Sequence, residues 1–372
     1  MDFHSVEQAF EEAVAEGVFP GAVVLIGREG EVVYERAFGW RSLAPAKTVM
    51  RPEVIFDLAS LTKPLATATA IMVLVRDGKI RIDDRVTRFL PTFGVFGKSP
   101  VTIRHLLTHT SGLAAWRPFY QEIAKPAKAE SIGSPRAKNH ILSRVHREKL
   151  VNAPGTRTVY SDLGFMVLGE IVELVGGCAL DRFCDDHIFK PLGLRSTSFF
   201  ELSKLRARTM DSGGDLIAPT EDCPWRKKIL YGEVHDDNAY AMGGVAGHAG
   251  LFSSAADIHR LLGCLDRCRN GKDDFLPRGL VEQFLSKDMT VPDSTWALGW
   301  DTPSPENSSA GSRFSPRSVG HLGFTGPSVW WDIEKSCHVI LLNNRVHPTR
   351  RNEKIKAFRP RIHDLIMEAV KP

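Results

Sequence analysis

A serine and a lysine three positions apart stand at the start of a long apolar run, in the stretch FDLASLTKPLATATAIMVLV at residues 56–75. On a helix, positions i and i+3 share a face, so a helix that begins near Ser60 brings its hydroxyl close to the Lys63 amine. Pro64 suits the first helical turn, where its missing N–H costs no hydrogen bond. Apolar surroundings disfavour the charged form of Lys63 and make it a candidate proton acceptor. The pair predicts a serine nucleophile, although one Ser-x-x-Lys arises by chance about once in such a chain.

Two later stretches strengthen this prediction. APGTRTVYSDLGF (residues 153–165) is similar to the Tyr-x-Asn element of class C β-lactamases, D-alanyl-D-alanine peptidases and family VIII carboxylesterases. GHLGFTG (residues 320–326) resembles the Lys-Thr-Gly strand of that superfamily in its His-x-Gly form. The resemblance extends to residues 77–91, 102–113 and 243–262, and the string GEVHDDNA at residues 232–239 resembles a branch of penicillin-binding-protein-like serine hydrolases.

The resemblance implies a fold and a set of roles. The expected fold is α+β: a class C β-lactamase-like antiparallel sheet flanked by the terminal helices, with an inserted helical domain and the active site between them. Ser60 would form an acyl-enzyme while Lys63 and Tyr160 remove and return its proton. The remaining implied roles are an oxyanion hole from the backbone N–H groups of Ser60 and Phe324 and substrate binding by Asp162, His321 and Gly323. No metal or cofactor is implied.

Two positions depart from the family pattern. Asp162 stands where many relatives have asparagine, and a carboxylate near Lys63 would favour the ammonium form. We therefore expect Lys63 to stay charged and to lower the phenol pKa of Tyr160, which becomes the better candidate base. His321 replaces a lysine, so a fixed positive charge becomes titratable. This predicts weak cephalosporinase activity and a histidine that donates a hydrogen bond to substrate or passes a proton to the leaving group.

Both ends of the chain indicate sheet and helix. Two β-rich runs at residues 22–26 and 32–37 flank a glycine turn and predict a hairpin, and residues 327–346 predict another. Because isolated hairpins are marginally stable, we expect both to join one antiparallel sheet covered by the terminal helices. The predicted domains are therefore residues 1–58 with 285–372, and a mainly helical domain at residues 59–284.

Helical periodicity dominates the middle of the chain. The predicted helices are Lys63–Asp77, Ile103–Leu107, Leu163–Val175, Leu180–Ile188 and Ala255–Arg267. The basic stretch at residues 117–149 is expected to be a solvated insertion. Trp296 and Trp300 alternate with small residues as in a half-buried strand, and Trp330 and Trp331 should point to opposite faces of theirs.

Composition excludes several other classes of function. The net charge of +4 is too small for a focused nucleic-acid surface, and six scattered cysteines without a Cys-x-x-Cys pair indicate reduced thiols rather than a zinc site or disulfide framework. No Gly-x-Ser-x-Gly elbow or phosphate-binding loop occurs. The acidic N-terminus and the short apolar runs predict a cytoplasmic chain without a membrane span.

Other histidines have weaker claims to chemistry. His105 and His109 have a metal-compatible spacing without the required glutamate, so we expect structural roles. His235, Asp236, Asp237 and His248 match no metal template, and we expect loop hydrogen bonds there.

Three functions remain open. The first is a serine hydrolase of small esters or amides; the second is a β-lactamase or D-amino-acid peptidase; the third is a binding or sensor protein that keeps the fold without turnover. All three act on small molecules, and the oligomeric state is not predicted.

Overall fold

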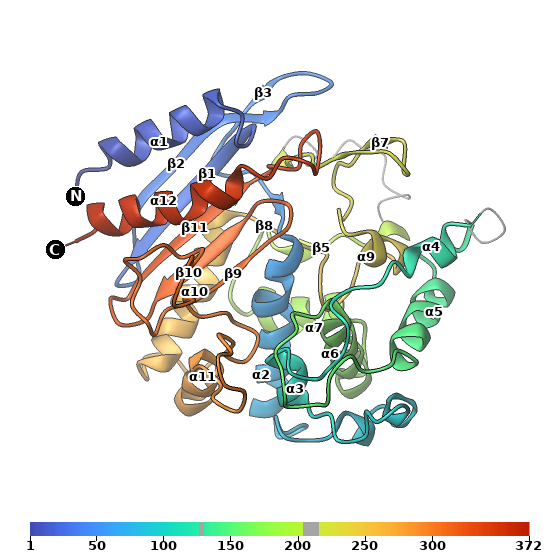
Figure 1. Ribbon diagram of the computed structural model, residues 1–372. Helices are drawn as coiled ribbons and strands as arrows, with labels where there is room; N and C mark the ends of the chain where they lie inside the picture. The colour runs from blue at the N-terminus through green and yellow to red at the C-terminus, as the bar shows by residue number, and fades with distance from the viewer. Residues whose placement is uncertain (126–129, 204–215, 372) are drawn as a thin grey trace.

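Six antiparallel strands form the central layer of the computed structural model, which describes residues 1–125, 130–203 and 216–371. Along the chain they are β1 (Gly21–Arg28), β2 (Glu31–Ser42), β3 (Thr48–Val49), β9 (Val319–Leu322), β10 (Ser328–Asp332) and β11 (Cys337–Asn343). In space their order is β3-β2-β1-β11-β10-β9. β1 and β11 pair antiparallel with Ala22 opposite Asn343. The two predicted hairpins therefore join into one sheet, as expected (Figure 1).

The terminal helices α1 (His4–Ala15) and α12 (Ile355–Ala369) cover one face of this sheet (Figure 1). Alternation along β1 explains how both faces become buried: Val24 packs in the core beneath these helices, whereas Val23 and Leu25 belong to the core on the other side. Trp330 and Trp331 separate in the same way, which confirms that they point to opposite faces.

Helix α10 (Ala255–Arg269) covers the opposite face of the sheet and contacts β1 and β11. The next helix along the chain, α11 (Arg278–Leu285), packs on α10. α10 falls within the range predicted for the helical domain although it packs on the sheet. The domain boundaries at residues 58 and 285 stay a prediction.

The helical part of the chain fills the space beside the sheet (Figure 1). Its longer elements are α2 (Thr69–Arg76), α5 (Pro135–His146) and α6 (Asp162–Gly176). Shorter elements are α3 (Ile103–Leu107), α4 (Tyr120–Ile123), α7 (Leu180–Cys184) with the π-helical turn η6 (Asp185–Phe189), α9 (Asp237–Ala241), and the 3₁₀ turns η3 (Val86–Arg88) and η4 (Pro91–Gly94). Small sheets add β4 (Phe56–Asp57), β8 (Leu251–Ser253) and β5 (Ser198–Phe199), and β6 (Asp222–Cys223) with β7 (Lys228–Ile229).

The helix predicted at residues 63–77 begins less regularly than expected. A 3₁₀ turn η1 (Ala59–Leu61) and a π-helical segment η2 (Lys63–Ala68) precede α2. Pro64 is the second residue of η2, where its missing N–H costs no hydrogen bond, as the sequence predicts.

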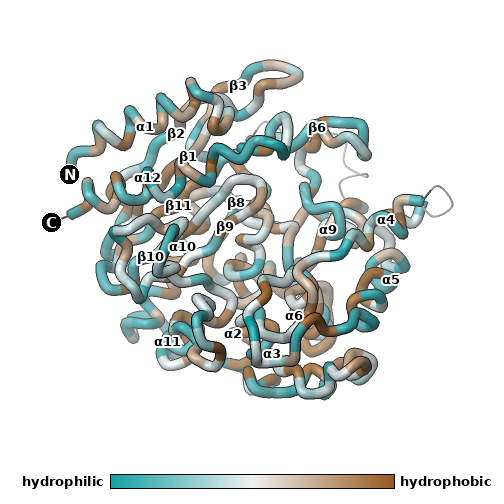
Figure 2. The backbone as a smooth tube through the Cα atoms, viewed as in Figure 1, coloured by the Kyte–Doolittle hydropathy of each residue, from teal (hydrophilic) through white to brown (hydrophobic). Residues whose placement is uncertain are grey.

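Two sequence expectations about local structure are wrong. The basic stretch contains α5, whose Ile141, Leu142 and Val145 are buried against the core, so it is not only a solvated insertion. Figure 2 shows hydrophobic and hydrophilic residues side by side along this helix. Trp296 and Trp300 do not share a strand: Trp296 forms an isolated β-bridge with Asp301, and the chain bends between the two tryptophans at Gly299 (φ +86°), which lies against Ala68 of η2.

Two global expectations concern membrane spans and cysteines in the described residues. No single helix there is long and apolar enough to cross a membrane; only the bent pair Asp162–Gly176 and Leu180–Phe189 meets that criterion, and only jointly. All six cysteines are free, and all but Cys178 are buried, as the scattered spacing predicts.

The terminal-helix core gives a stability prediction. Phe10 is fully buried, stacks on Phe38 with ring centroids 4.6 Å apart and meets the edge of Phe358. Phe10→Ala should lower the free energy of unfolding by about 3–5 kcal/mol, measured by urea denaturation, because a large cavity opens between helix and sheet. Met289→Ala, at a 78% exposed position, is the control and should change stability by less than about 0.5 kcal/mol. Equal effects would contradict this core assignment.

Candidate active site

Ser60 lies in the η1 turn, directly after strand β4. The preceding residue, Ala59, has a φ of +47°, which a residue with a side chain rarely adopts. Buried hydrogen bonds hold this conformation: Asp57 Oδ1 accepts from the Ala59 N–H at 2.8 Å, and the Thr62 hydroxyl donates to the Ala59 carbonyl at 2.6 Å. The second oxygen of Asp57 accepts from the His235 N–H at 2.6 Å. The strained turn is therefore fixed by its surroundings.

Lys63 is fully buried one turn after Ser60, as the spacing predicts. Its Nζ donates to Ser60 Oγ at 3.0 Å and to the His248 carbonyl at 3.1 Å, and it lies 2.6 Å from Asp162 Oδ1. The ammonium also faces the ring of Tyr160, 4.8 Å from its centroid. Three oxygens from three distant segments thus converge on one amine.

The protonation of Lys63 follows from this environment. Burial by itself lowers the pKa of Lys63, but the charge of Asp162 and further polar contacts outweigh it and raise the pKa above its ordinary value. The expectation that Asp162 keeps Lys63 charged agrees with this direction. A charged lysine is a hydrogen-bond donor to Ser60 and has no lone pair to accept the serine proton.

Tyr160 and Ser60 line one cavity, and Ser161 and Asp162 follow Tyr160 at the start of α6. The backbone here is anchored by Ser161, whose N–H donates to His109 Nδ1 at 3.0 Å and whose hydroxyl donates to the Ala114 carbonyl at 2.7 Å. The His109 ring also lies against Tyr160, with centroids 4.6 Å apart. His109 is structural, as expected, but it supports the candidate site directly.

The phenol of Tyr160 differs from the sequence-based expectation. Desolvation raises its pKa above the ordinary value, even though Lys63 lowers that pKa, while Asp162 adds to the rise. Hydrogen-bonding contributions from Lys63 and Ser60 also lower the pKa without reversing the direction. Burial outweighs the lowering by Lys63, which has the predicted sign, so the phenol keeps its proton near neutral pH.

The other wall of the site is the end of strand β9 and the turn after it. Gly323 lies so close to the nucleophile turn that a Cβ there would be 2.5 Å from the Leu58 carbonyl oxygen, which explains the glycine. Thr325 donates its hydroxyl to the Asp57 carbonyl at 2.7 Å. The turn that carries Phe324 is thus fastened to the segment that carries Ser60.

Two buried arginines hold the same turn from behind. Arg345 donates from Nε and Nη2 to the Phe324 carbonyl at 2.9 and 2.7 Å. Arg359 donates from Nη2 to the Gly323, Gly326 and Pro327 carbonyls. Sequence reasoning missed both residues, although the density of arginines at residues 345–361 was a visible signal.

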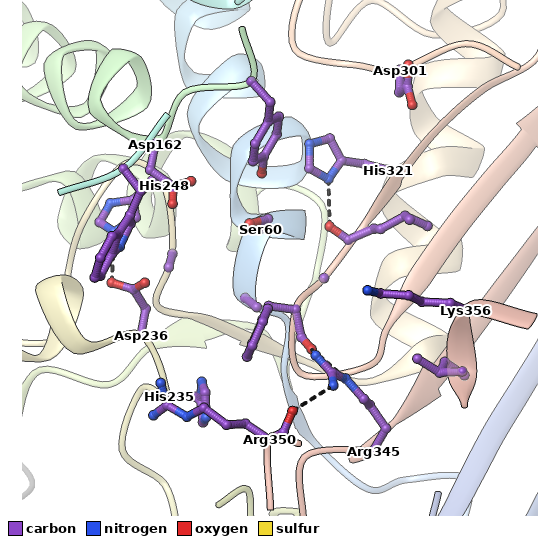
Figure 3. A pocket seen from close by; sticks show the side chains of 18 of the residues that line it. Ser60, Asp162, His235, Asp236, His248, Asp301, His321, Arg345, Arg350 and Lys356 are labelled. Atoms are coloured by element: carbon purple, nitrogen blue, oxygen red, sulfur yellow. Dashed lines mark hydrogen bonds and ion pairs between the residues drawn. The ribbon is translucent and has the colours of Figure 1, made fainter. Parts of the chain in front are cut away.

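His321 is 4% exposed on β9, and its ring points towards Ser60 (Figure 3). Its Nδ1 lies 2.9 Å from the Leu322 carbonyl, which can only accept, so Nδ1 carries the hydrogen and Nε2 presents a lone pair. Burial, followed by the charge of Lys63, lowers the pKa of His321 to about 3. The expected titratable cation is therefore a neutral acceptor, and the predicted donor role of its free nitrogen is wrong for this tautomer.

The polar cluster that matches no metal template in the sequence lies on the side of Ser60 away from His321 (Figure 3). Its members there are His235, Asp236 and His248. His248 Nε2 is 2.9 Å from Asp236 Oδ1, and that carboxylate also caps α9 by accepting from the Ala239 N–H at 2.7 Å. His235 stacks on Phe324 with ring centroids 5.6 Å apart. These contacts are the expected loop hydrogen bonds, but the cluster also lines the cavity.

All of these residues surround one cavity of about 720 Å³. The sequence-predicted residues on its wall are Ser60, Tyr160, Asp162, His321, Gly323 and Phe324, and Lys63 lies buried beneath them. Trp116 and Trp296 add aromatic walls, and charged side chains complete the lining: Asp301, Arg345, Arg350, Glu353, Lys356 and Arg359. The cavity can hold a small substrate whose carbonyl meets the hydroxyl of Ser60.

The neutral state of His321 gives a pH prediction. Between pH 5 and 8 this ring should show no titration, because its pKa lies near 3. Nitrogen-15 NMR of the imidazoles should assign it the neutral Nδ1–H form throughout, with the spectrum of His321→Asn identifying its signals. A protonation step near pH 6.5 that disappears in His321→Asn would contradict the neutral assignment.

Comparisons with known proteins agree with this geometry. The family model described as Beta-lactamase matches residues 6–360. The protein named "Putative D-alanyl-D-alanine carboxypeptidase" of Escherichia coli (strain K12) is 32% identical over 88% of this chain and 79% of its own length. The protein named N-acetylmuramyl-L-alanine amidase of Bacillus subtilis (strain 168) is 33% identical over 92% of this chain and 80% of its own length.

Solved structures show the same fold. The octameric penicillin-binding protein homologue from Pyrococcus abyssi superposes with a TM-score of 0.74 at 22% identity, over 100% of this chain and 78% of that one. EstCE1, a hydrolase with promiscuous acyltransferase activity, gives a TM-score of 0.71 at 25% identity, over 95% of this chain and 97% of that one. The α+β fold, the family model and the relatives agree: the chain belongs to the Beta-lactamase family of the serine hydrolase superfamily that includes penicillin-binding proteins and esterases.

Proposed function

We propose that the protein is a serine hydrolase that cleaves small esters or amides through an acyl-enzyme on Ser60. The observation that carries this proposal is the position of the Lys63 amine, 3.0 Å from Ser60 Oγ and 2.6 Å from Asp162 Oδ1. A hydroxyl, an amine and a carboxylate in this order provide a path for a proton away from the nucleophile.

The proposed first step is a proton relay. Lys63 first passes one of its protons to Asp162 Oδ1, which leaves a lone pair on Nζ, and Ser60 Oγ then attacks the substrate carbonyl and passes its proton to that nitrogen. Negative charge thereby moves from the carboxylate to the carbonyl oxygen of the substrate. The backbone N–H groups of Ser60 and Phe324 would bind that oxygen, a type of contact worth about 10²–10³-fold in rate.

The protonated phenol of Tyr160 suits the second half of the reaction. A group with a raised pKa holds its proton until a strong base appears, and the departing alkoxide or amine is such a base. Tyr160 would donate that proton to the leaving group and regain one from Lys63, which recovers the proton held by Asp162. The lone pair on His321 Nε2 would accept a hydrogen bond from the leaving group or from the water that hydrolyses the acyl-enzyme.

A D-amino-acid peptidase or related amidase of cell-wall fragments is the second candidate. The two curated relatives whose names refer to such substrates are 32% and 33% identical over about nine-tenths of the chain. Strong activity on cephalosporins is not proposed, because the neutral His321 offers no fixed positive charge to a substrate carboxylate.

Covalent labelling tests the hydrolase proposal. A fluorophosphonate should add one equivalent to the wild type at Ser60 and none to Ser60→Ala, measured by intact mass and peptide mapping. Rates on p-nitrophenyl acetate and butyrate, nitrocefin and D-alanyl peptides then distinguish esterase, β-lactamase and peptidase. A folded wild type that forms no adduct and turns over none of the panel would identify a binding or sensor protein instead.

The role of Tyr160 predicts a dependence on the leaving group. Tyr160→Phe should lower kcat by about 10²–10⁴-fold on amides and alkyl esters, whose leaving groups need a proton. The loss should be much smaller on p-nitrophenyl esters, whose leaving group departs as a stable anion. Equal losses on both substrate types would contradict a general-acid role.

The relay predicts a change in pH dependence. In Asp162→Asn, burial is no longer opposed by the carboxylate, so the pKa of Lys63 should fall and the amine should lose its proton at lower pH. Activity on p-nitrophenyl esters should fall by about 10²-fold or more and should then rise with pH as Lys63 becomes neutral. The wild type should lack this rise near neutral pH.

Asp301→Asn is the matched control for that measurement. Asp301 lines the same cavity but bonds to Thr295 and to the Thr302 N–H rather than to Lys63. Its variant should keep the wild-type shape of the pH profile above pH 7, because burial raises the pKa of Asp301 only to about 6. An unchanged profile in Asp162→Asn would exclude the relay.

A further inference from the structure

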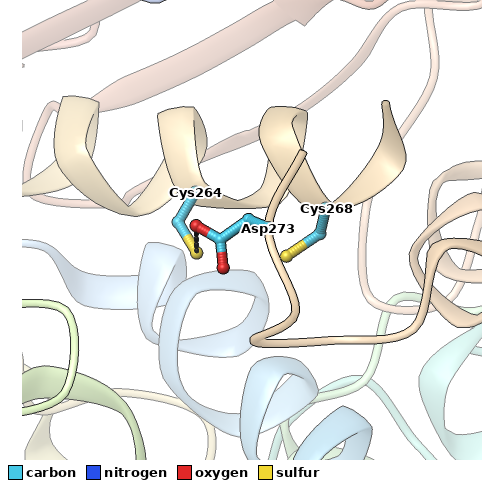
Figure 4. A group of neighbouring side chains, drawn as sticks. All are labelled: Cys264, Cys268 and Asp273. Atoms are coloured by element: carbon cyan, nitrogen blue, oxygen red, sulfur yellow. Dashed lines mark hydrogen bonds between the residues drawn. The ribbon is translucent and has the colours of Figure 1, made fainter. Parts of the chain in front are cut away.

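Two cysteines and an aspartate meet at the C-terminal end of α10, which contributes no residue to the cavity described above. Cys264 and Cys268 are four positions apart on the helix and therefore share a face. Asp273 comes from the loop that follows, and its carboxylate lies close to the two thiols (Figure 4). The two Sγ atoms and one carboxylate oxygen lie within 4.8 Å of one another.

The surroundings favour the ionised forms of Cys268 and Asp273, whereas the hydrogen bond with Cys268 and burial raise the pKa of the Cys264 thiol. The Leu276 N–H donates to Cys268 Sγ at 3.4 Å, and the Phe275 N–H donates to Asp273 Oδ1 at 3.0 Å. Backbone donors aimed at sulfur and carboxylate stabilise negative charge and orient the ligands of a metal. The thiol of Cys264 lies 3.8 Å from Asp273 Oδ2. The thiols are buried, whereas 27% of the Asp273 side chain is exposed and leaves an approach from solvent.

We propose that Cys264, Cys268 and Asp273 form a binding site for a thiophilic divalent cation of the zinc class, with water as the fourth ligand. In a tetrahedral zinc site with bonds of about 2.0–2.3 Å, neighbouring ligand atoms are about 3.5–3.8 Å apart. The observed limit of 4.8 Å therefore requires a closing movement of only about 1 Å. Binding would displace two thiol protons and form two metal–sulfur bonds and one metal–oxygen bond, with no change of oxidation state.

Charge balance supports the same cation. Two thiolates and one carboxylate carry three negative charges, and a divalent cation neutralises two of them. Arg267 supplies the third positive charge, since its Nη2 lies 3.1 Å from Asp273 Oδ2. A monovalent cation would leave the buried site negative, which is unfavourable in a low-dielectric environment.

The sequence has no Cys-x-x-Cys pair and therefore did not predict a zinc site. The Cys-x-x-x-Cys spacing also lies within the range seen in zinc sites, and a helix places such a pair on one face. The third ligand is set by the loop conformation, which the spacing does not reveal. The proposed cation would connect the end of α10, which packs on β1 and β11, to the loop leading into α11, and so would stabilise the fold.

Cobalt titration of the full chain tests this proposal independently of any hydrolase activity. Reduced, chelator-treated protein should bind one Co²⁺ with the near-ultraviolet absorption of cobalt–thiolate bonds, and Zn²⁺ should remove that absorption. Zn²⁺ should also raise the melting temperature in a concentration-dependent way and protect two thiols from alkylation. Absence of the thiolate absorption in the wild type would overturn the proposal without any variant.

Variants then assign the ligands. Cys268→Ser should abolish the cobalt–thiolate spectrum, and Asp273→Asn, which keeps both thiols, should weaken Zn²⁺ binding by at least about 10–100-fold. Cys184→Ser, a buried cysteine on α7, is the matched control and should leave the spectrum unchanged. An unaltered spectrum in folded Cys268→Ser, or a Cys264–Cys268 disulfide in protein purified without reductant, would count against the site.

Discussion

The charge of Lys63, buried without any exposed surface, is the interaction on which the site depends. An ammonium removed from water is costly unless oxygens replace the solvent, and breaking such a buried pair typically costs about 3–5 kcal/mol. Here the oxygens come from Ser60, Asp162 and the His248 carbonyl, which lie on three separate segments. Satisfying one charge therefore brings together the nucleophile turn, the start of α6 and the loop before β8.

The second constraint is the close approach of two turns. Ala59 holds an unfavourable backbone conformation beside Ser60, and Gly323 leaves room for the Leu58 carbonyl against it. Asp57 serves both turns, since its carboxylate accepts from Ala59 and its carbonyl accepts from Thr325. The buried arginines behind the second turn fix its carbonyls, so the peptide groups that would bind an oxyanion are held before substrate arrives.

Burial also decides which groups can move protons. Desolvation raises the pKa of the Tyr160 phenol and lowers that of the His321 imidazole, so each is held neutral. The charged pair Lys63–Asp162 lies beside Ser60, with the amine 3.0 Å from Ser60 Oγ. One cavity thereby holds a proton donor, a lone-pair acceptor and an ion pair, which are the components that acyl transfer needs at neutral pH.

Local patterns in the sequence were enough for much of this protein. The Ser60–Lys63 spacing, the hairpins and the opposite orientations of Trp330 and Trp331 all follow from helical or strand periodicity, and all are present in the structure. The bend between Trp296 and Trp300 and the buried face of α5 were not predicted, because packing against distant elements overrode the local pattern.

The sequence by itself determined which chemical groups are available and which of them lie on one helical turn or one strand. Only the tertiary structure decided their protonation states, because the pKa of Lys63, Tyr160 or His321 depends on burial and on charges from remote segments. It likewise decided that Asp273 meets Cys264 and Cys268, since a carboxylate on a loop has no periodicity that reveals its neighbours.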